Sequence, residues 1–388
     1  MRWHAAMAGL AASLVGIGLG RFAYTPLIPA LVGAHWFPAT QVVYLGAANL
    51  AGYLAGALVA RRLAAAASAR TVLRGMMVLA SLSFFACAAP ISVGWYFAWR
   101  FAAGAAGGVI MVLAAPTILP VTDPARRGLV GGMIFTGVGL GIAASGTLVP
   151  LLLQAGLPTT WCGLGVLALV LTVIAWGGWP AVGPQPARAN ADAAAPLTLG
   201  VGALLVEYGL NAAGLVPHMV FLVDFIARGL GAGLAVGGFY WVVFGLGAMA
   251  GPLLAGAVAD RIGFAGTLRL GFLIESLAVL LPALTRAAPA LLLSSAVAGA
   301  FTPGVVPLVL GRVHELLPGD PVGQRVAWSW TTIAFALFQA AGAYLYSFLF
   351  ARSGGDYAML FAIGTGALAL ALAIELAVAA RVRVLRVL

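Results

Sequence analysis

Long runs of apolar residues, separated by short polar stretches, dominate the pattern of this chain. Each of twelve runs is long enough to cross the roughly 30 Å hydrocarbon core of a bilayer as a helix. In chain order, as spans one to twelve, they cover residues 4–32, 38–60, 72–92, 94–120, 128–153, 160–180, 197–226, 234–258, 265–285, 289–311, 325–350 and 356–380. The pattern predicts an all-α membrane protein with twelve transmembrane helices.

Composition agrees with a membrane protein. Hydrophobic residues make up 63% of the chain and charged residues only 8%, whereas soluble domains carry about 25% charged residues. The net charge is +10, but no basic run alternates with aromatic residues as a nucleic-acid surface would. We therefore expect membrane lipid and a small-molecule substrate as partners, and no nucleic acid.

The positions of the arginines predict the orientation in the membrane. If the N-terminus is cytoplasmic, the loops on the opposite side hold only Arg228, Arg286 and Arg352, and nearly all other arginines lie on the cytoplasmic side. Such an excess follows the positive-inside rule. We expect a multi-pass protein of a bacterial inner membrane, a monomer, with both termini in the cytoplasm.

A polar, proline-containing stretch at 181–196 divides the spans into six and six and is typical of a cytoplasmic linker. An internal echo supports two halves, because residues 56–61 resemble residues 256–261, and 104–108 resemble 299–304. The sequence thus predicts two six-helix bundles, 1–180 and 197–388, related by pseudo-symmetry as in many secondary transporters.

Several motifs resemble those of the major facilitator superfamily, over essentially the whole chain. They are Gly256-x-x-x-Asp260-Arg261-x-Gly263, Arg100-x-x-x-Gly104-x-x-x-Gly108, and Gly137-x-Gly139-x-Gly141 followed by Gly146 and Pro150. The stretch Gly18-Leu-Gly-Arg21-Phe-Ala-Tyr-Thr-Pro-Leu-Ile-Pro29 resembles the bacterial YbfB/YjiJ-type branch of that superfamily more narrowly.

The resemblance implies the major facilitator fold and secondary transport by alternating access. It also implies that spans one, four, seven and ten line a central cavity, and that Asp260 and Arg261 form a gating latch on the inner face. In the first half Ala60 stands where the loop motif has aspartate, so that copy lacks the latch carboxylate.

Arg21 is the most informative single residue, because it places a permanent charge in the middle of span one. A guanidinium does not deprotonate in proteins, and a charge in hydrocarbon costs at least ~2.5–3.5 kcal/mol. Tyr24 and Thr25 share its helical face. We interpret these three residues as a substrate site for a carboxylate or phosphate, with a structural arginine tied to backbone carbonyls as the alternative.

Arg100, about one turn inside the outer end of span four, is a second candidate cationic contact for the substrate. It could also carry proton coupling, or its long side chain could reach the membrane interface.

Span seven carries a polar stripe, because Glu207, Asn211, Gly214 and His218 follow one another at helical spacing. Histidine exchanges protons near physiological pH. The stripe predicts proton coupling by Glu207 and His218 and a substrate contact by Asn211. In the alternative, Glu207 hydrogen-bonds a neighbouring helix and His218 lies near the outer interface.

The remaining polar residues of the spans are weaker candidates. Trp328 and Gln339 share a stripe on span eleven and are expected to contact substrate, although such stripes are often packing faces. Interfacial pairs are expected for Glu275 with Arg269 and for Glu375 with Arg381. Asp224 and Arg228 are expected to form a solvated pair at helical spacing.

We expect a secondary transporter of a small organic anion or carboxylate-bearing solute, coupled to protons. Proton-driven efflux of hydrophobic compounds is the alternative, since the chain is rich in aromatic residues, and a non-transporting receptor is a further one. No catalytic or metal-binding spacing occurs in the sequence, so we expect neither an enzyme nor a cofactor.

Overall fold

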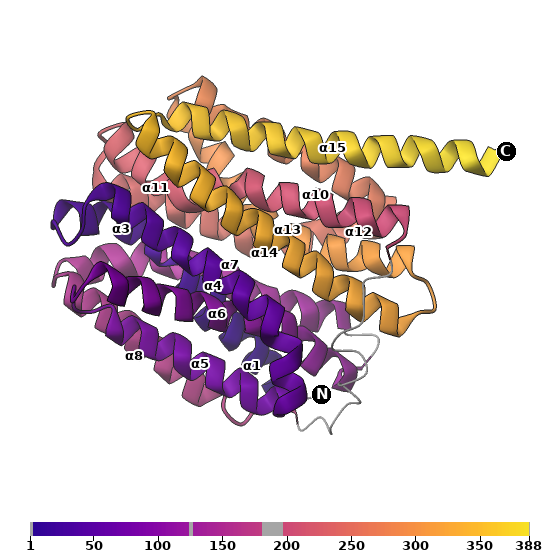
Figure 1. The fold of residues 1–388 in the computed structure, drawn as a ribbon, viewed down its shortest axis with the longest axis horizontal. Helices are drawn as coiled ribbons and strands as arrows, with labels where there is room; N and C mark the ends of the chain where they lie inside the picture. Colours follow the sequence, from indigo (N-terminus) through magenta and orange to yellow (C-terminus); the bar gives the residue numbers. More distant parts are fainter. Residues whose placement is uncertain (1–2, 124–126, 181–196, 388) are drawn as a thin grey trace.

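The computed structural model describes residues 3–123, 127–180 and 197–387, and these residues form helices and short connections with no strand (Figure 1). The first half comprises α1 (Trp3–Ser13), η1 (Leu14–Leu19), α2 (Gly20–Phe22), α3 (Tyr24–Gly33), α4 (Ala39–Ala66), α5 (Ala69–Ala86), α6 (Val93–Ile118), η2 (Leu119–Val121), α7 (Arg127–Leu153) and α8 (Leu157–Ala175). The second half comprises α10 (Leu199–Val216), η4 (Pro217–Phe221), α11 (Leu222–Asp224), η5 (Phe225–Gly229), α12 (Gly233–Leu284), α13 (Ala288–Leu316), α14 (Pro321–Arg352) and α15 (Tyr357–Val387).

Eleven helical stretches of the described residues are long and apolar enough to cross a membrane. One of them, α12, has 52 residues and contains a single non-helical residue, Gly263, with φ 77° and ψ 164°. Glycine adopts such a positive φ without a steric penalty, and the chain turns there between the predicted spans eight and nine. Counting α12 as two spans, the structure confirms the expected twelve.

The first span of each half is a continuous helix whose α-helical pattern is interrupted by π-helical turns. Span one passes from α1 through the π-helical η1 to α2 and α3, and span seven passes from α10 through the π-helical η4 and η5, with Pro217 at the first interruption. Interrupted helices at matching positions of two halves are typical of transporter binding sites, and π-helical turns are frequent at functional sites. Both interruptions therefore direct attention to the region between spans one and seven.

Glycines allow helices to pack backbone to backbone in both halves. A methyl group on Gly104 of α6 would collide with the carbonyl oxygen of Asn49 on α4, and one on Gly299 of α13 would collide with that of Phe244 on α12. The number of residues between Gly104 and Gly299 equals the number between their partners Asn49 and Phe244. The same contact therefore recurs at one sequence offset in the two halves.

Two more pairs follow the same offset. Gly52 and Gly56 of α4 press on the backbone of α6, and Gly247 and Gly251 of α12 press on that of α13. In helix packing the counterpart of Gly56 is thus Gly251, and Gly256 does not take part in this contact. Nothing lies within 4 Å of a methyl group built on Gly256.

The helices of the first half, coloured indigo to magenta, lie on one side of the molecule, and those of the second half lie on the other (Figure 1). Between them α7 packs on α12 and α4 packs on α14. Gly139 and Gly245 bring the backbones of α7 and α12 into contact. The predicted linker 181–196 lies outside the described residues, so the bundle boundaries at 180 and 197 stay predictions.

The packing of span one differs along its length. Its second part, α3, packs on α11 and η4 of the opposite half. Its first part, α1, packs on α6, α7 and α8, while α10 of span seven packs on α13, α14 and α15. The halves thus meet closely along the parts of spans one and seven that lie farther from the chain termini.

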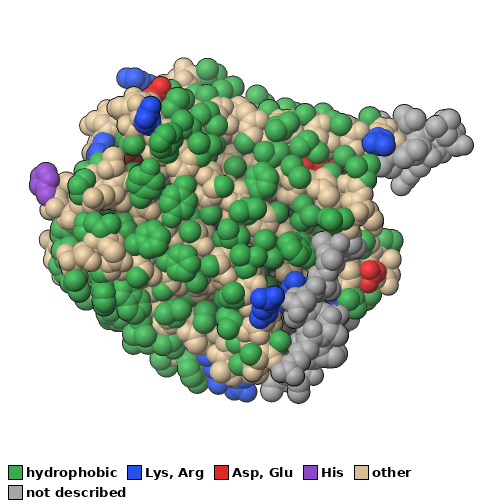
Figure 2. Space-filling view, viewed as in Figure 1, with side chains coloured by type: hydrophobic (Ala, Val, Ile, Leu, Met, Phe, Trp, Pro, Cys, Tyr) green, Lys and Arg blue, Asp and Glu red, His purple; other side chains and the backbone are tan. Residues whose placement is uncertain are grey.

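Apolar side chains are spread over the whole molecular face in Figure 2, with few charged ones between them. Exposed apolar residues include Val173 and Ile174 on α8. A helix bundle with so much exposed apolar surface suits a lipid environment.

Candidate functional site

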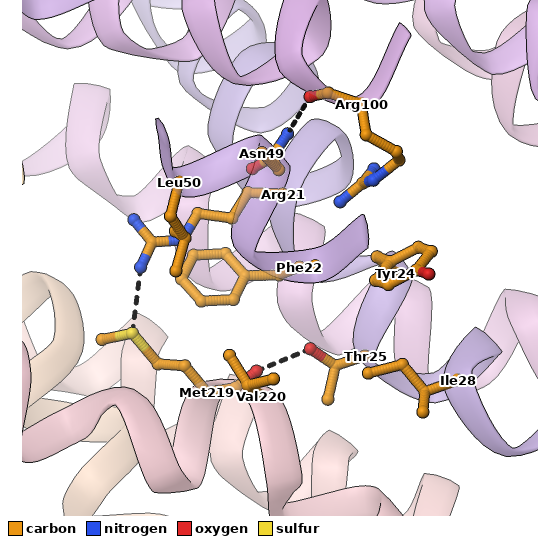
Figure 3. A pocket seen from close by; sticks show the side chains of 11 residues that line it. Arg21, Phe22, Tyr24, Thr25, Ile28, Asn49, Leu50, Arg100, Met219 and Val220 are labelled. Carbon is orange, nitrogen blue, oxygen red and sulfur yellow. Dashed lines mark hydrogen bonds between the residues drawn. The ribbon is translucent and has the colours of Figure 1, made fainter. Parts of the chain in front are cut away.

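Arg21 and Arg100 line one small pocket at the interruption in span one (Figure 3). The pocket lies between the two halves of the molecule. It is lined by Arg21, Phe22, Tyr24, Thr25, Ile28, Gly46, Asn49, Leu50, Arg100, Met219 and Val220. Neither arginine pairs with an acidic side chain of the described residues. The pocket therefore holds two positive charges without a protein counter-charge.

Arg21 is held only by weak contacts. Its Nη2 donates to the Sδ atom of Met219 at 3.0 Å, and its guanidinium carbon lies 4.8 Å from the centre of the Phe22 ring and 5.6 Å from that of Tyr53. A thioether is a weak acceptor. Arg21 is also partly exposed, so its planar fork of N–H groups has capacity for a stronger acceptor.

Arg100 is engaged much more firmly. It is 3% exposed, its Nη1 donates to the carbonyl of Gly20 at 3.0 Å, and its guanidinium lies 4.2 Å from the ring centre of Tyr24. The amide of Asn49 donates to the same carbonyl at 3.3 Å and to the Arg100 carbonyl at 3.0 Å. Backbone at a helix interruption inside a membrane needs such donors, so the geometry favours a structural role for Arg100.

Tyr24 and Thr25 both bind backbone carbonyls. The Tyr24 hydroxyl donates to Val42 at 2.7 Å, and its ring underlies Arg100 rather than Arg21. The Thr25 hydroxyl donates to the carbonyl of Met219 at 2.6 Å. Thr25 thus ties span one to span seven, across the boundary between the halves.

The polar stripe of span seven faces its own half of the molecule. Asn211 donates to Glu275 of α12, and a methyl group on Gly214 would meet Leu368 of α15. His218 lies 2.8 Å from the Ser294 hydroxyl of α13. The stripe therefore does not face Arg21, because it is buried among α12, α13 and α15.

Glu207, at the start of the stripe, is 1% exposed, and its Oε1 has no hydrogen-bond partner among the described residues. The ring of His218 packs edge-on against Phe361, with centroids 5.0 Å apart. Their predicted proton-coupling role is not tested by this arrangement. What changes is its location, which is inside the second half and away from the arginine pocket.

Met219 is the residue of span seven that contacts Arg21. Its sulfur accepts from Arg21 and, at 3.3 Å, from the amide of Gln339 on α14, and its carbonyl accepts from Thr25. A methionine carries no chemical signal of a polar site, so the sequence analysis missed it. The adjacent Pro217 and its matching interruption in span one were the available signal.

Gln339 therefore joins the group around Arg21, whereas Trp328 does not. Trp328 lies three helical turns away on α14, where its carbonyl accepts from Thr331 and Thr332. Asn211 likewise contacts Glu275 instead of the pocket.

Asp260 and Arg261 lie just before the turn at Gly263. Both are exposed, and neither forms a hydrogen bond or ion pair in the part of the chain that the structure describes. The turn is held instead by Glu315, which accepts from the backbone of Phe264 at 3.2 Å and pairs with Arg312 at 2.9 Å. The latch formed by Asp260 and Arg261 stays a prediction.

Three expected pairs need correction. Arg269 pairs with Glu375 at 3.0 Å, which leaves Glu275 buried with Asn211 as its partner. Asp224 does pair with Arg228, but it is 1% exposed and also accepts from Tyr357 at 2.6 Å, so this pair is not solvated. Sequence spacing identified neighbours on one helix and missed partners on another.

Among the described residues, no three His, Cys, Asp or Glu side chains are grouped so that they could hold a metal ion. Among the described residues that line the pocket, the polar groups that remain available are the guanidinium of Arg21 and the Nε of Arg100, which are donors, and the side-chain oxygen of Asn49, which is an acceptor. The two guanidinium groups make the pocket positively charged. Such a site suits an acceptor-rich, negatively charged ligand.

Comparisons with known proteins agree with this architecture. Residues 13–376 match the model of a family described as the uncharacterised MFS-type transporter YbfB. No curated protein matches the chain. Among solved structures, it is similar to the xylose transporter XylE from E. coli in a partially occluded inward-open conformation. The TM-score is 0.72, with 14% identity over 96% of each chain.

At this identity the likeness to XylE concerns the fold alone, which is that of a membrane transporter. The family match covers nearly the whole chain, including both interrupted spans and the pocket between them. This chain belongs to the YbfB family of MFS-type transporters, and so to the major facilitator superfamily.

Proposed function

We propose that this protein carries a small organic anion, such as a carboxylate-bearing solute, across the bacterial inner membrane, as a monomer with both termini in the cytoplasm. The observation that carries the proposal is Arg21, a partly exposed cation between the halves whose only hydrogen bond to a described residue is to a thioether sulfur. A carboxylate would replace that sulfur with a charge-assisted, bidentate contact, which is about twice as strong as a neutral one.

Ligand binding and the movement of the halves are connected at Met219. Arg21 and Thr25 of the first half both bind this residue of the second half. An anion that takes Arg21 away from the sulfur weakens the link between spans one and seven. Alternating access requires such a change in the contacts between halves.

The close packing of α3 on η4 and α11 lies on the side away from the termini. With cytoplasmic termini, the outer side would be closed and the pocket would be reached from the cytoplasm. Asp260 and Arg261, exposed near the turn at Gly263, would then be separated from their gating partners. In the outward-facing state they would close the inner face.

Efflux of hydrophobic compounds is the second candidate, and the aromatic residues beside the pocket favour it. The ring centroids of Phe22 and Trp241 lie 6.1 Å apart across the boundary between the halves. Trp241 in turn stacks on Phe244, with ring centroids 4.8 Å apart. Such a wall would accept a flat apolar compound. It would also suit an aromatic carboxylate, which needs both the wall and the cation.

Purified protein in proteoliposomes tests the proposal. Small organic acids and hydrophobic cations are first screened for a thermal shift, and each hit is then followed as flux together with the internal pH. Uptake of an organic acid with proton movement supports the proposal. Transport of hydrophobic cations alone favours efflux, and binding of an acid without flux favours a receptor; either result contradicts the proposal.

A further inference from the structure

Glu275 carries a fully buried carboxyl group in the part of α12 that follows the turn at Gly263, away from the arginine pocket. It is 0% exposed, and so is its partner Asn211 on α10. The Asn211 amide donates to Glu275 Oε2. The two residues join span seven to span nine inside the second half.

No positive charge is available to Glu275 among the described residues. Arg269 precedes it on α12 but pairs with Glu375 of α15 at 3.0 Å. On α10, Glu207 lies one turn from Asn211 and is itself acidic. His218 lies two turns from Asn211 and is held by Ser294 of α13. A buried ionised carboxylate without a cation is costly, so the surroundings of Glu275 favour its neutral, protonated form.

Two unpartnered atoms complete the argument. Glu275 Oε1 and Asn211 Oδ1 are both buried, and neither has a hydrogen-bond partner among the described residues. A protonated carboxyl has one O–H donor, and an amide oxygen accepts. One proton on Glu275 Oε1 would therefore satisfy both atoms, with Asn211 returning its N–H to Oε2. Unmade hydrogen bonds of buried groups cost about 1–3 kcal/mol each.

We propose that Glu275 and Asn211 form a proton-binding site in the second half of the transporter. When the O–H bond of Glu275 breaks, the proton passes to a water molecule that reaches the site from one side of the membrane. The carboxylate then remains, and the amide of Asn211 is its only direct donor. The role of this site in transport rests on the proposed function, whereas proton binding by Glu275 does not.

Span seven connects this site to the arginine pocket. Asn211 lies on α10 and Met219 on η4, with the interruption at Pro217 between them. Loss of the proton would remove the O–H hydrogen bond of Glu275 and leave a buried carboxylate beside Asn211, which changes the contact between spans seven and nine, while an anion would loosen Met219 from Arg21. Both events act on one interrupted helix, which provides a physical route for coupling.

His218 is a weaker proton site in this geometry. The Ser294 hydroxyl donates to the carbonyl of Ala278 at 2.7 Å, so it accepts from the Nε2–H of His218. The remaining ring nitrogen, Nδ1, has no partner among the described residues. Glu275, in contrast, is already hydrogen-bonded to Asn211, whose side chain also carries an unused acceptor.

Infrared difference spectra of the purified protein in lipid, between acidic and alkaline buffer, test the site. We expect the C=O band of a protonated carboxyl group that is absent in Glu275→Gln and retained in Glu375→Gln, the matched control, because Glu375 is buried but paired with Arg269. Asn211→Ala should keep the band but shift it, because the amide hydrogen bonds are lost. It also serves as the test if Glu275→Gln does not fold.

A band that survives Glu275→Gln, or one that Asn211→Ala leaves unshifted, would overturn the proposal. So would a band that disappears when sodium replaces potassium at constant pH, because this would identify a sodium site. In proteoliposomes, Glu275→Gln should lose accumulation driven by a pH gradient and keep substrate exchange. If the wild type moves no organic anion but the band behaves as expected, the proposed substrate fails while the proton site stands.

Discussion

Arg21 of span one donates to the sulfur of Met219 on span seven at 3.0 Å, across the boundary between the two halves. One turn further along span one, Thr25 donates to the carbonyl of the same methionine. Met219, whose side chain is apolar apart from its sulfur, thus accepts the hydrogen bonds of both Arg21 and Thr25. It connects the only partly exposed cation of the pocket to a π-helical turn of the second half.

The first prediction concerns the planar fork of Arg21. Arg21→Lys keeps the charge but removes bidentate geometry, so affinity for an organic acid should fall by about tenfold, corresponding to roughly 1.4 kcal/mol. Arg21→Ala should abolish binding while the protein still folds, because the weak contacts of Arg21 contribute little to stability. Calorimetric titration and thermal unfolding measure the two effects. Normal affinity in Arg21→Ala would exclude an anion site here.

Arg100 should respond in the opposite way. Arg100→Met leaves the Gly20 carbonyl with one donor fewer and removes the cation from the Tyr24 ring. We expect a loss of stability of about 2 kcal/mol or more, since a buried hydrogen bond from a charged group contributes about 1.5–3 kcal/mol and the cation–π contact adds to it. Thermal unfolding in detergent compares it with Arg21→Ala. If Arg100→Met unfolds at the wild-type temperature and fails to bind the acid, Arg100 is a ligand residue after all.

Thr25→Val tests the link between the halves. It keeps the shape of the side chain but removes the hydrogen bond to Met219, which is worth about 1 kcal/mol. The fraction of molecules in which α3 and α11 are separated should rise about fivefold. Distances between spin labels at the ends of these helices measure this fraction. Thr25→Ser keeps a hydroxyl and should behave as the wild type. Equal distance distributions for the valine and serine variants would show that this bond does not hold the halves together.

Backbone packing of α4 on α6 gives a prediction about stability alone. In Gly104→Ala the new methyl group collides with the Asn49 carbonyl, and overpacking typically costs about 1–3 kcal/mol. Gly75→Ala on α5 is the matched control, because nothing lies within 4 Å of its methyl group. It should be neutral or slightly stabilising. Equal unfolding temperatures for the two variants would contradict the close packing described above.

The spans and the buried arginine could be read from the chain because both are local properties. A run of apolar residues is long enough to cross a bilayer whatever surrounds it, and Arg21 is costly within such a run wherever its helix lies. The turn at Gly263 was also within reach, since glycine and polar residues interrupt the apolar pattern there.

The direction that each polar stripe faces could not be predicted. Helical spacing shows that Glu207, Asn211 and His218 share one side of span seven, but in a membrane the neighbours on every side are apolar. Only the packing of α10 shows that this side faces α12, α13 and α15. For the same reason Glu275 was expected at an interface and lies instead beside Asn211.

By itself, the sequence determined the twelve membrane spans, the motifs of the two halves and the existence of a cation within span one, because hydrophobic length and charge act residue by residue. Tertiary structure alone decided which groups meet that cation. The rotation of span seven about its own axis places Met219 of η4 beside Arg21, while the titratable stripe faces α12, α13 and α15. A helix rotation of this kind leaves no trace in hydrophobic periodicity, because lipid and neighbouring helices are equally apolar.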